Sequence, residues 1–167
     1  MAYPKKIRNF GAFKNGENYI GLVSAGKLPS VKIKTEADTG AGLDGEYAVD
    51  MGTEAMQTEL TFIEWAPEVI TLLGTRDRIV LRPVAKAATD GDDEATGYIF
   101  TLGGLNTSLE FDELKPREGA TMKITSEVTY FRLEREGEEL IKIDVEHAVR
   151  VIGGVDQLAA LRSKMGF

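Results

Sequence analysis

The sequence reads YIFTLGGLNTSLEF over residues 98–111. Alternating apolar residues put one face of a strand toward a core as far as Leu102, and the alternation resumes in the opposite register from Leu105. Gly103 and Gly104 lie where the register changes. A β-bulge or sharp bend there would let one long strand serve two sheets, as the corners of a β-sandwich require. This stretch therefore predicts a mainly β fold built around a bend.

The segments around this stretch extend the same prediction. Residues 121–135 alternate in the same way and change face near Tyr130 and Phe131. The turn at Gly137 then leads into an apolar segment at residues 140–143, the pattern of a short-looped hairpin. Residues 31–36 and 56–62 also alternate with period two, which predicts two strands with one buried and one solvent-exposed face.

Two short helices complete the predicted fold. Pro67 fits a first helical position and Gly74 a C-terminal stop, with apolar residues between them. Near the end of the chain, apolar residues have helical spacing from Val155 onward, with Asp156 at the start and Arg162 in the last turns, which suits the helix dipole. The predicted class is a β-sandwich or barrel with one internal and one C-terminal helix.

Length and composition limit the possible functions. A chain of 167 residues has the size of one domain, so residues 1–167 are predicted to form a single domain. No apolar run approaches the length of a membrane span, and no signal peptide is expected at the start, which favours assembly in the cytoplasm. Because the chain has no cysteine, disulfides and thiolate metal sites are excluded. The net charge of −7 argues against tight wrapping of nucleic acid.

The charges are unevenly distributed along the chain. Residues 1–34 carry seven basic side chains and one acidic side chain, Glu17. Residues 35–75 carry nine acidic side chains and no Lys, Arg or His. Two solvated faces would explain this pattern. The alternative is electrostatic complementarity between copies, in which a basic patch on one subunit meets an acidic patch on the next. The basic residues are Lys5, Lys6, Arg8, Lys14, Lys27, Lys32 and Lys34.

No motif for catalysis or for a cofactor has the context that it needs. Residues 40–45 match Gly-x-Gly-x-x-Gly, but no helical pattern follows and the nearby acids would repel a pyrophosphate. The acidic run at residues 90–94 lacks the spacing of a calcium-binding loop. His147 is the only histidine, and no Gly-x-Ser-x-Gly motif accompanies it. Trp65 is interpreted as a core or interface anchor. We therefore predict no enzyme activity, no cofactor and no metal site.

Several segments taken together resemble one family, the major tail tube proteins of contractile-tailed bacteriophages and R-type pyocins. The resemblance is strongest in residues 128–133, Gly137, residues 139–140, 143–144 and 153–158, followed by Arg162 and Gly166. Residues 28–29, 40–45, 49–52 and 54–56 add matches in the N-terminal half, and residues from about 76 to 119 cannot be matched motif by motif.

The resemblance implies a structural protein of the virion. Six copies would close into a ring, and the rings would stack head to tail into a hollow tube that carries the genome without binding it specifically. The tube would assemble on a baseplate around a tape-measure protein, meet a tail terminator protein, and be driven through the host envelope by a contracting sheath. An extended loop at about residues 39–50 is expected to reach neighbouring subunits, and the C-terminal helix to dock onto the sheet. The expected contact residues are Gly40, Gly42, Leu43, Asp44, Gly45, Glu46 and Asp50.

Two alternatives remain open on the sequence alone. The chain could form the tube of a type VI-like secretion device or of a pyocin, which passes no DNA. It could also be a soluble β-barrel that binds a ligand, although no set of residues indicates a pocket.

Overall fold

A computed structural model describes residues 4–87 and 95–166 of the chain. The acidic run at residues 90–94 lies outside the described residues. Neither described helix is long and apolar enough to cross a membrane. In chain order the elements are β1 (Lys5–Lys14), β2 (Glu17–Asn18), β3 (Val23–Lys27), β4 (Ile33–Asp38), β5 (Tyr47–Thr53), β6 (Met56–Phe62), α1 (Pro67–Ile70), β7 (Arg76–Ala87), β8 (Ala95–Phe111), β9 (Met122–Arg135), β10 (Glu138–Asp144), β11 (Val149–Ile152), β12 (Val155–Asp156) and α2 (Ala159–Met165).

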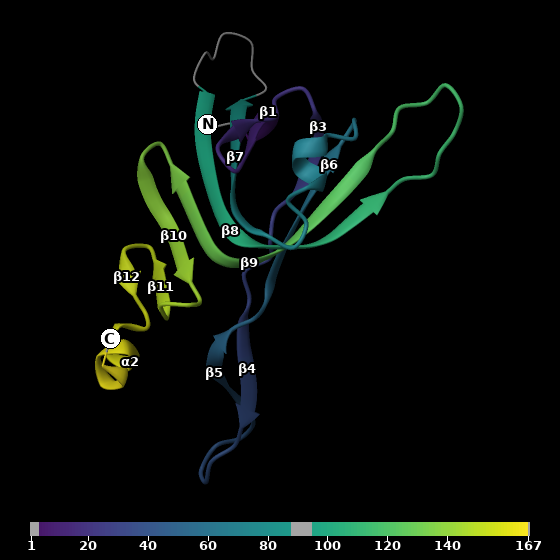
Figure 1. Ribbon diagram of the computed structural model, residues 1–167. Coiled ribbons are helices and arrows are strands. Elements are labelled where there is room, and N and C mark those ends of the chain that lie inside the picture. Colours follow the sequence, from purple (N-terminus) through teal and green to yellow (C-terminus); the bar gives the residue numbers. More distant parts are fainter. Residues whose placement is uncertain (1–3, 88–94, 167) are drawn as a thin grey trace.

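Most strands belong to one strongly curved sheet (Figure 1). Eight of its strands follow the order β12-β11-β10-β9-β8-β7-β1-β2, and β6 joins it by pairing with β9 and carries β3 on its other side. The pairs are antiparallel throughout. β8 and β9 curve together through the middle of the molecule and hold the two halves of the sheet at an angle. The predicted mainly β fold with two short helices is confirmed.

β9 changes its outer partner in the middle of its length. Its first half, up to Val128, pairs with β6, and its second half, from Tyr130, pairs with β10. Against β8 the register shifts at the same place, because Gly103 faces Tyr130 while Gly104 faces Val128. Thr129 is therefore the extra residue of a β-bulge. The irregularity predicted at the two glycines is found at that place, but its extra residue belongs to β9, and β9 rather than β8 is the strand that serves both halves of the sheet.

Gly104 marks the closest approach of the two central strands. A Cβ atom placed on Gly104 would lie 1.9 Å from the carbonyl oxygen of Glu127 and 2.8 Å from its carbonyl carbon. These are backbone atoms in the middle of a sheet, so they cannot move aside as a flexible side chain would. Only glycine allows β8 and β9 to cross at this distance.

The core lies inside the fold of the sheet and is centred on β6. Met56, Thr58, Leu60 and Phe62 are all buried, which confirms the predicted alternation of this strand. Phe62 also packs edge to face against Tyr19, with 5.6 Å between ring centroids. Buried partners come from five other strands: Ala12, Ile79, Leu81, Leu102, Met122, Ile124, Val128, Phe131 and Ile143.

The buried face of β8 differs from the prediction beyond the bend. Asn106 is fully buried, whereas Thr107, expected to face inward, is exposed. A second register shift lies here, because Asn106 faces Ser126 while Ser108 faces Thr125. The inward face therefore changes at Thr107 rather than at the glycine pair. A polar side chain occupies the inward position because buried polar partners meet it there.

Three further predictions about local structure are corrected. Only Val31 of residues 31–36 packs against the core, because β4, which begins at Ile33, is exposed along its whole length. The internal helix ends at Ile70 rather than near Gly74. Val155 belongs to β12, since the turn at Gly153 and Gly154 brings it back onto β11, and the C-terminal helix begins at Ala159.

We expect the substitution Gly104→Ala to destabilise the protein by about 3 kcal/mol, because the methyl group would force two paired strands apart. Gly97→Ala in the same strand is the matched control, since its Cβ would lie 3.7 Å from Glu136 Oε1, an ordinary contact distance. Urea unfolding monitored by circular dichroism measures the free energy of unfolding of both variants. Equal midpoints for the two variants would contradict the account of the crossing.

Candidate functional site

A hairpin made of β4 and β5 projects from the body of the molecule (Figure 1). The two strands form a two-stranded sheet of their own. The pairing runs from Ile33 opposite Thr53 to Asp38 opposite Tyr47, and residues 39–46 form the tip. The loop predicted at about residues 39–50 is thus the outer half of a longer arm, with residues 47–50 paired in β5.

The tip holds six of the seven predicted contact residues, and all six are exposed. The backbone N–H of Leu43 donates to the carbonyl oxygen of Gly40 at 3.2 Å, which closes a tight turn. Gly42 has φ +86°, a left-handed conformation that glycine adopts without strain. A strand rather than a helix follows the tip, which agrees with the interpretation of Gly40 to Gly45 as a turn. The six residues are Gly40, Gly42, Leu43, Asp44, Gly45 and Glu46.

The seventh predicted residue, Asp50, makes an ion pair within the same chain. Its carboxylate accepts hydrogen bonds from both terminal nitrogens of Arg150 on β11, 100 positions away in sequence. The Arg150 side chain is almost completely buried, whereas the Asp50 side chain is 46% exposed. Hydrogen bonds from Arg150 and then from the Gly52 backbone N–H lower the pKa of Asp50. The pair links the projecting arm to the curved sheet.

The arm exposes apolar and acidic side chains together. Leu43 is 57% exposed and Met51 is 50% exposed. Glu36, Asp38 and Asp44 are exposed among them. An arm that keeps large apolar side chains in water, on strands that no described element covers, has the composition of a protein contact surface.

Not all seven basic N-terminal residues are available for a basic patch on the surface. Lys14 is fully buried, so it cannot belong to a basic docking surface. Lys34 lies on the acidic arm itself. The remaining basic residues are exposed and come from different elements, β1 and β3 among them. The alternative of a basic patch therefore loses Lys14 and Lys34, and five exposed basic residues remain.

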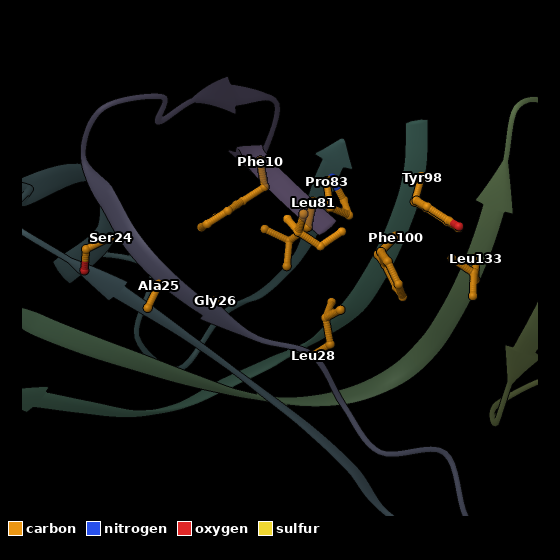
Figure 2. A pocket seen from close by; sticks show the side chains of 11 residues that line it. Phe10, Ser24, Ala25, Gly26, Leu28, Leu81, Pro83, Tyr98, Phe100 and Leu133 are labelled. Carbon is orange, nitrogen blue, oxygen red and sulfur yellow. The ribbon is translucent and has the colours of Figure 1, made fainter. Parts of the chain in front are cut away.

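An apolar groove lies between β1 and β3 (Figure 2). Its volume is about 580 Å³, and it extends down to β7, β8 and β9. Phe10, Leu28, Tyr98 and Phe100 are among its lining residues. Among the residues described, β1 and β3 do not pair with each other, so the groove opens between two strand edges. The lining contains no ionised side chain, and Tyr98 and Ser24 supply its hydroxyl groups.

The two other residues considered in the sequence lie away from the arm. His147 is exposed, and its Nδ1 lies 2.7 Å from Asp144 Oδ2, a local contact across three positions. Trp65 is 39% exposed and packs edge to face against Phe111, with 5.3 Å between centroids. Trp65 therefore anchors a surface cluster rather than the core.

Comparison with known proteins identifies the family. The family model described as phage tail tube protein FII matches residues 4–166. The chain is 30% identical over 171 aligned residues to the tail tube protein of Escherichia phage P2, with 99% of each chain covered. It is 29% identical over 147 residues to the major tail tube protein of Serratia phage KSP20, covering 87% of this chain and 85% of that protein. The chain belongs to the phage tail tube protein family.

Solved structures show the same fold at low sequence identity. A chain of the PVC sheath-tube complex, from an extracellular contractile injection system in the extended state, superposes with a TM-score of 0.59 at 12% identity. The match covers 79% of this chain and 92% of that one. A chain of the PVC sheath/tube terminator structure gives a TM-score of 0.58 at 12% identity, covering 80% and 98%.

Sequence reasoning located the tip of the arm but missed what holds its base. Arg150 is one of several arginines in β-rich sequence, and nothing local distinguishes it. The groove was also missed, because its lining residues come from five strands that are far apart in sequence.

We expect Asp50→Asn to loosen the arm, because it removes the charge that pairs with Arg150. Hydrogen–deuterium exchange should be faster in residues 33–53, and Asp44→Asn at the tip serves as the matched control. Unchanged exchange in Asp50→Asn would show that the ion pair does not hold the arm.

The same pair predicts a dependence on pH. A carboxyl whose folded-state pKa is lowered contributes stability that is complete above its unfolded pKa of about 3.9 and is lost as the pH falls through the folded value. Exchange in the arm should therefore rise selectively in acid below about pH 4, relative to β6, once corrected for intrinsic rates. An arm whose relative protection does not change with pH would contradict this assignment.

Proposed function

We propose that this protein is the subunit of the inner tail tube of a contractile phage, and that its activity is polymerisation. Six copies close into a ring, and rings stack into a hollow tube that conducts DNA. Contraction of the sheath drives this tube through the host envelope. Membership of the tail tube family supports the proposal over nearly the whole chain.

The projecting arm is the observation that carries the mechanism. Its strands are largely exposed in the single subunit, and its tip combines Leu43 with Asp44 and Glu46 at the surface. A ring that stacks on identical rings needs heterologous contacts, in which unlike surfaces of two copies meet. We assign one side of such a contact to Gly40, Gly42, Leu43, Asp44, Gly45, Glu46 and Asp50. Asp50 would act by fixing the direction of the arm.

The remaining partners follow from this role. Residues 1–167 act as one domain that meets itself, the sheath, the tape-measure protein, the baseplate and the tail terminator protein. DNA passes without specific binding, which suits a chain with a net charge of −7. The protein turns over no external substrate, is assembled in the cytoplasm of the host bacterium and ends in the virion.

A second candidate is the tube of a phage-tail-like device such as a pyocin or a type VI-like system. The similarity of the fold to chains from an extracellular contractile injection system favours it. Genes for head proteins near the gene for this chain would indicate a phage, and genes for a membrane complex would indicate a secretion device.

Negative-stain electron microscopy of the purified protein over a series of concentrations tests polymerisation. We expect hollow rings or tubes of uniform diameter, because the exposed apolar surface of the arm favours association. Baseplate extract added at low protein concentration provides the nucleus that growth needs. Monomeric particles under every condition, with the extract included, would contradict the proposal.

Reversal of charge at the tip tests the assigned contact. We expect the double variant Asp44→Lys and Glu46→Lys to raise the concentration needed for assembly about tenfold, which corresponds to about 1.4 kcal/mol. Glu113→Lys with Glu118→Lys makes the same change of charge on another exposed loop. Sedimentation of tubes measures the assembly of the two double variants and of the unaltered protein. If both double variants assemble equally well, the tip is not part of the interface between copies.

A further inference from the structure

A lysine, an aspartate and an asparagine meet in the interior of the sheet. Lys14 ends β1, Asp77 lies on β7 and Asn106 on β8. Lys14 Nζ lies 2.9 Å from Asn106 Oδ1, 3.2 Å from Asp77 Oδ1 and 3.0 Å from Asp77 Oδ2. The side chains of Lys14 and Asp77 are 0% and 2% exposed, and Asn106 is fully buried. The amine is thus in contact with both an amide carbonyl and a carboxyl group, away from water.

The environment shifts Lys14 from the ammonium ion toward the neutral amine. Burial lowers the pKa of Lys14, against the opposing effect of the Asp77 charge and hydrogen bond. Within an apolar interior, an ammonium–carboxylate pair can pass a proton and become a neutral amine and a neutral carboxylic acid. A neutral lysine amine is a nucleophile, whereas the ammonium ion is not.

The Asn106 amide is held and polarised as an electrophile. Its Oδ1 accepts hydrogen bonds from Lys14 Nζ and, at 2.6 Å, from the hydroxyl of the buried Ser126. Its Nδ2 donates to the carbonyl oxygen of Leu72 at 3.1 Å, which fixes the orientation of the amide plane. Donors on a carbonyl oxygen stabilise the negative charge that develops there during attack at the carbon.

Asp77 is placed to move the protons. Asp77 Oδ1 accepts a hydrogen bond from Lys14 Nζ. Asp77 Oδ2 is buried close to the same nitrogen but makes no aligned hydrogen bond to any residue that the structure describes. A carboxyl oxygen in this position can accept a proton from the attacking nitrogen, as a general base does.

We propose that Lys14 and Asn106 form an intramolecular isopeptide bond, with Asp77 as the general acid–base and Ser126 as the oxyanion donor. Lys14 passes one proton to Asp77 and its amine attacks Asn106 Cγ. Asp77 protonates Nδ2 and takes a second proton from Nζ. The Cγ–Nδ2 bond then breaks with its electron pair on nitrogen, the carbonyl re-forms, and one ammonia leaves. The products are a secondary amide and neutral Asp77, and no oxidant or other reactant is consumed.

The bond would join two strands that do not pair with each other. β7 lies between β1 and β8 in the sheet, so the link would bridge over the strand that separates them. The two residues are 92 positions apart in sequence, so the link would close a large loop of the unfolded chain. It would hold β1 to the central hairpin under load.

The mass of the intact purified protein tests the proposal. We expect a mass lower than that of the sequence by one ammonia, and a digest that contains a branched peptide joining Lys14 to Asn106 in tandem mass spectra. The full sequence mass with unbranched peptides at both positions, in protein from cells and in assembled tubes, would overturn it.

Two variants distinguish the isopeptide bond from other reactions that release ammonia. Asp77→Asn keeps the shape of the side chain but cannot transfer the protons, and Lys14→Arg removes the primary amine. Both variants should have the full mass. A succinimide at an asparagine also lacks one ammonia, but it would persist in both variants and give no branched peptide, which would overturn the proposal. If the variants fail to fold, the branched peptide of the unaltered protein decides the question.

Discussion

The fold depends on the crossing of β8 and β9 at Gly104, where no side chain fits between the strand and the Glu127 carbonyl. The bulge at Thr129 lies beside this crossing and lets β9 pair with β6 before it and β10 after it. One continuous hairpin can therefore hold both halves of a curved sheet and enclose a core between them. The arm depends on this arrangement too, because its C-terminal strand leads into β6 and its Asp50 pairs with Arg150 beyond the bend.

The sequence predicted those parts of the fold that rest on local chemistry. Alternation in residues 56–62 and the glycine pair at 103–104 each specify a local geometry. Alternation in β4 was misread, because period two shows that a strand has two faces but not that this subunit covers either of them. Asn106 and Lys14 were also misplaced, since a buried polar residue is accepted only where distant partners satisfy it, and sequence spacing does not reveal those partners.

In the candidate site, too, the sequence predicted the features that depend on local residues and missed those that depend on long-range contacts. Glycine and acidic residues close together indicated the exposed turn at the tip of the arm, since both properties belong to the local sequence. The ion pair between Asp50 and Arg150 joins residues that are distant in sequence, and so does the lining of the apolar groove. Only the folded sheet brings these residues together. The arm also exposes apolar residues. The subunit of a polymer can bury such residues against neighbouring subunits, whereas a monomer would have to bury them within its own fold.

A helical reconstruction of the assembled tube by cryo-electron microscopy tests the central claim, that the projecting arm is the contact between copies. The account predicts that residues 39–46 pack against a second copy, that Leu43 is buried there, and that the Asp50–Arg150 pair is retained at the base. A tube in which the tip of every arm stands free in solvent, with all contacts made by the curved sheet, would contradict it.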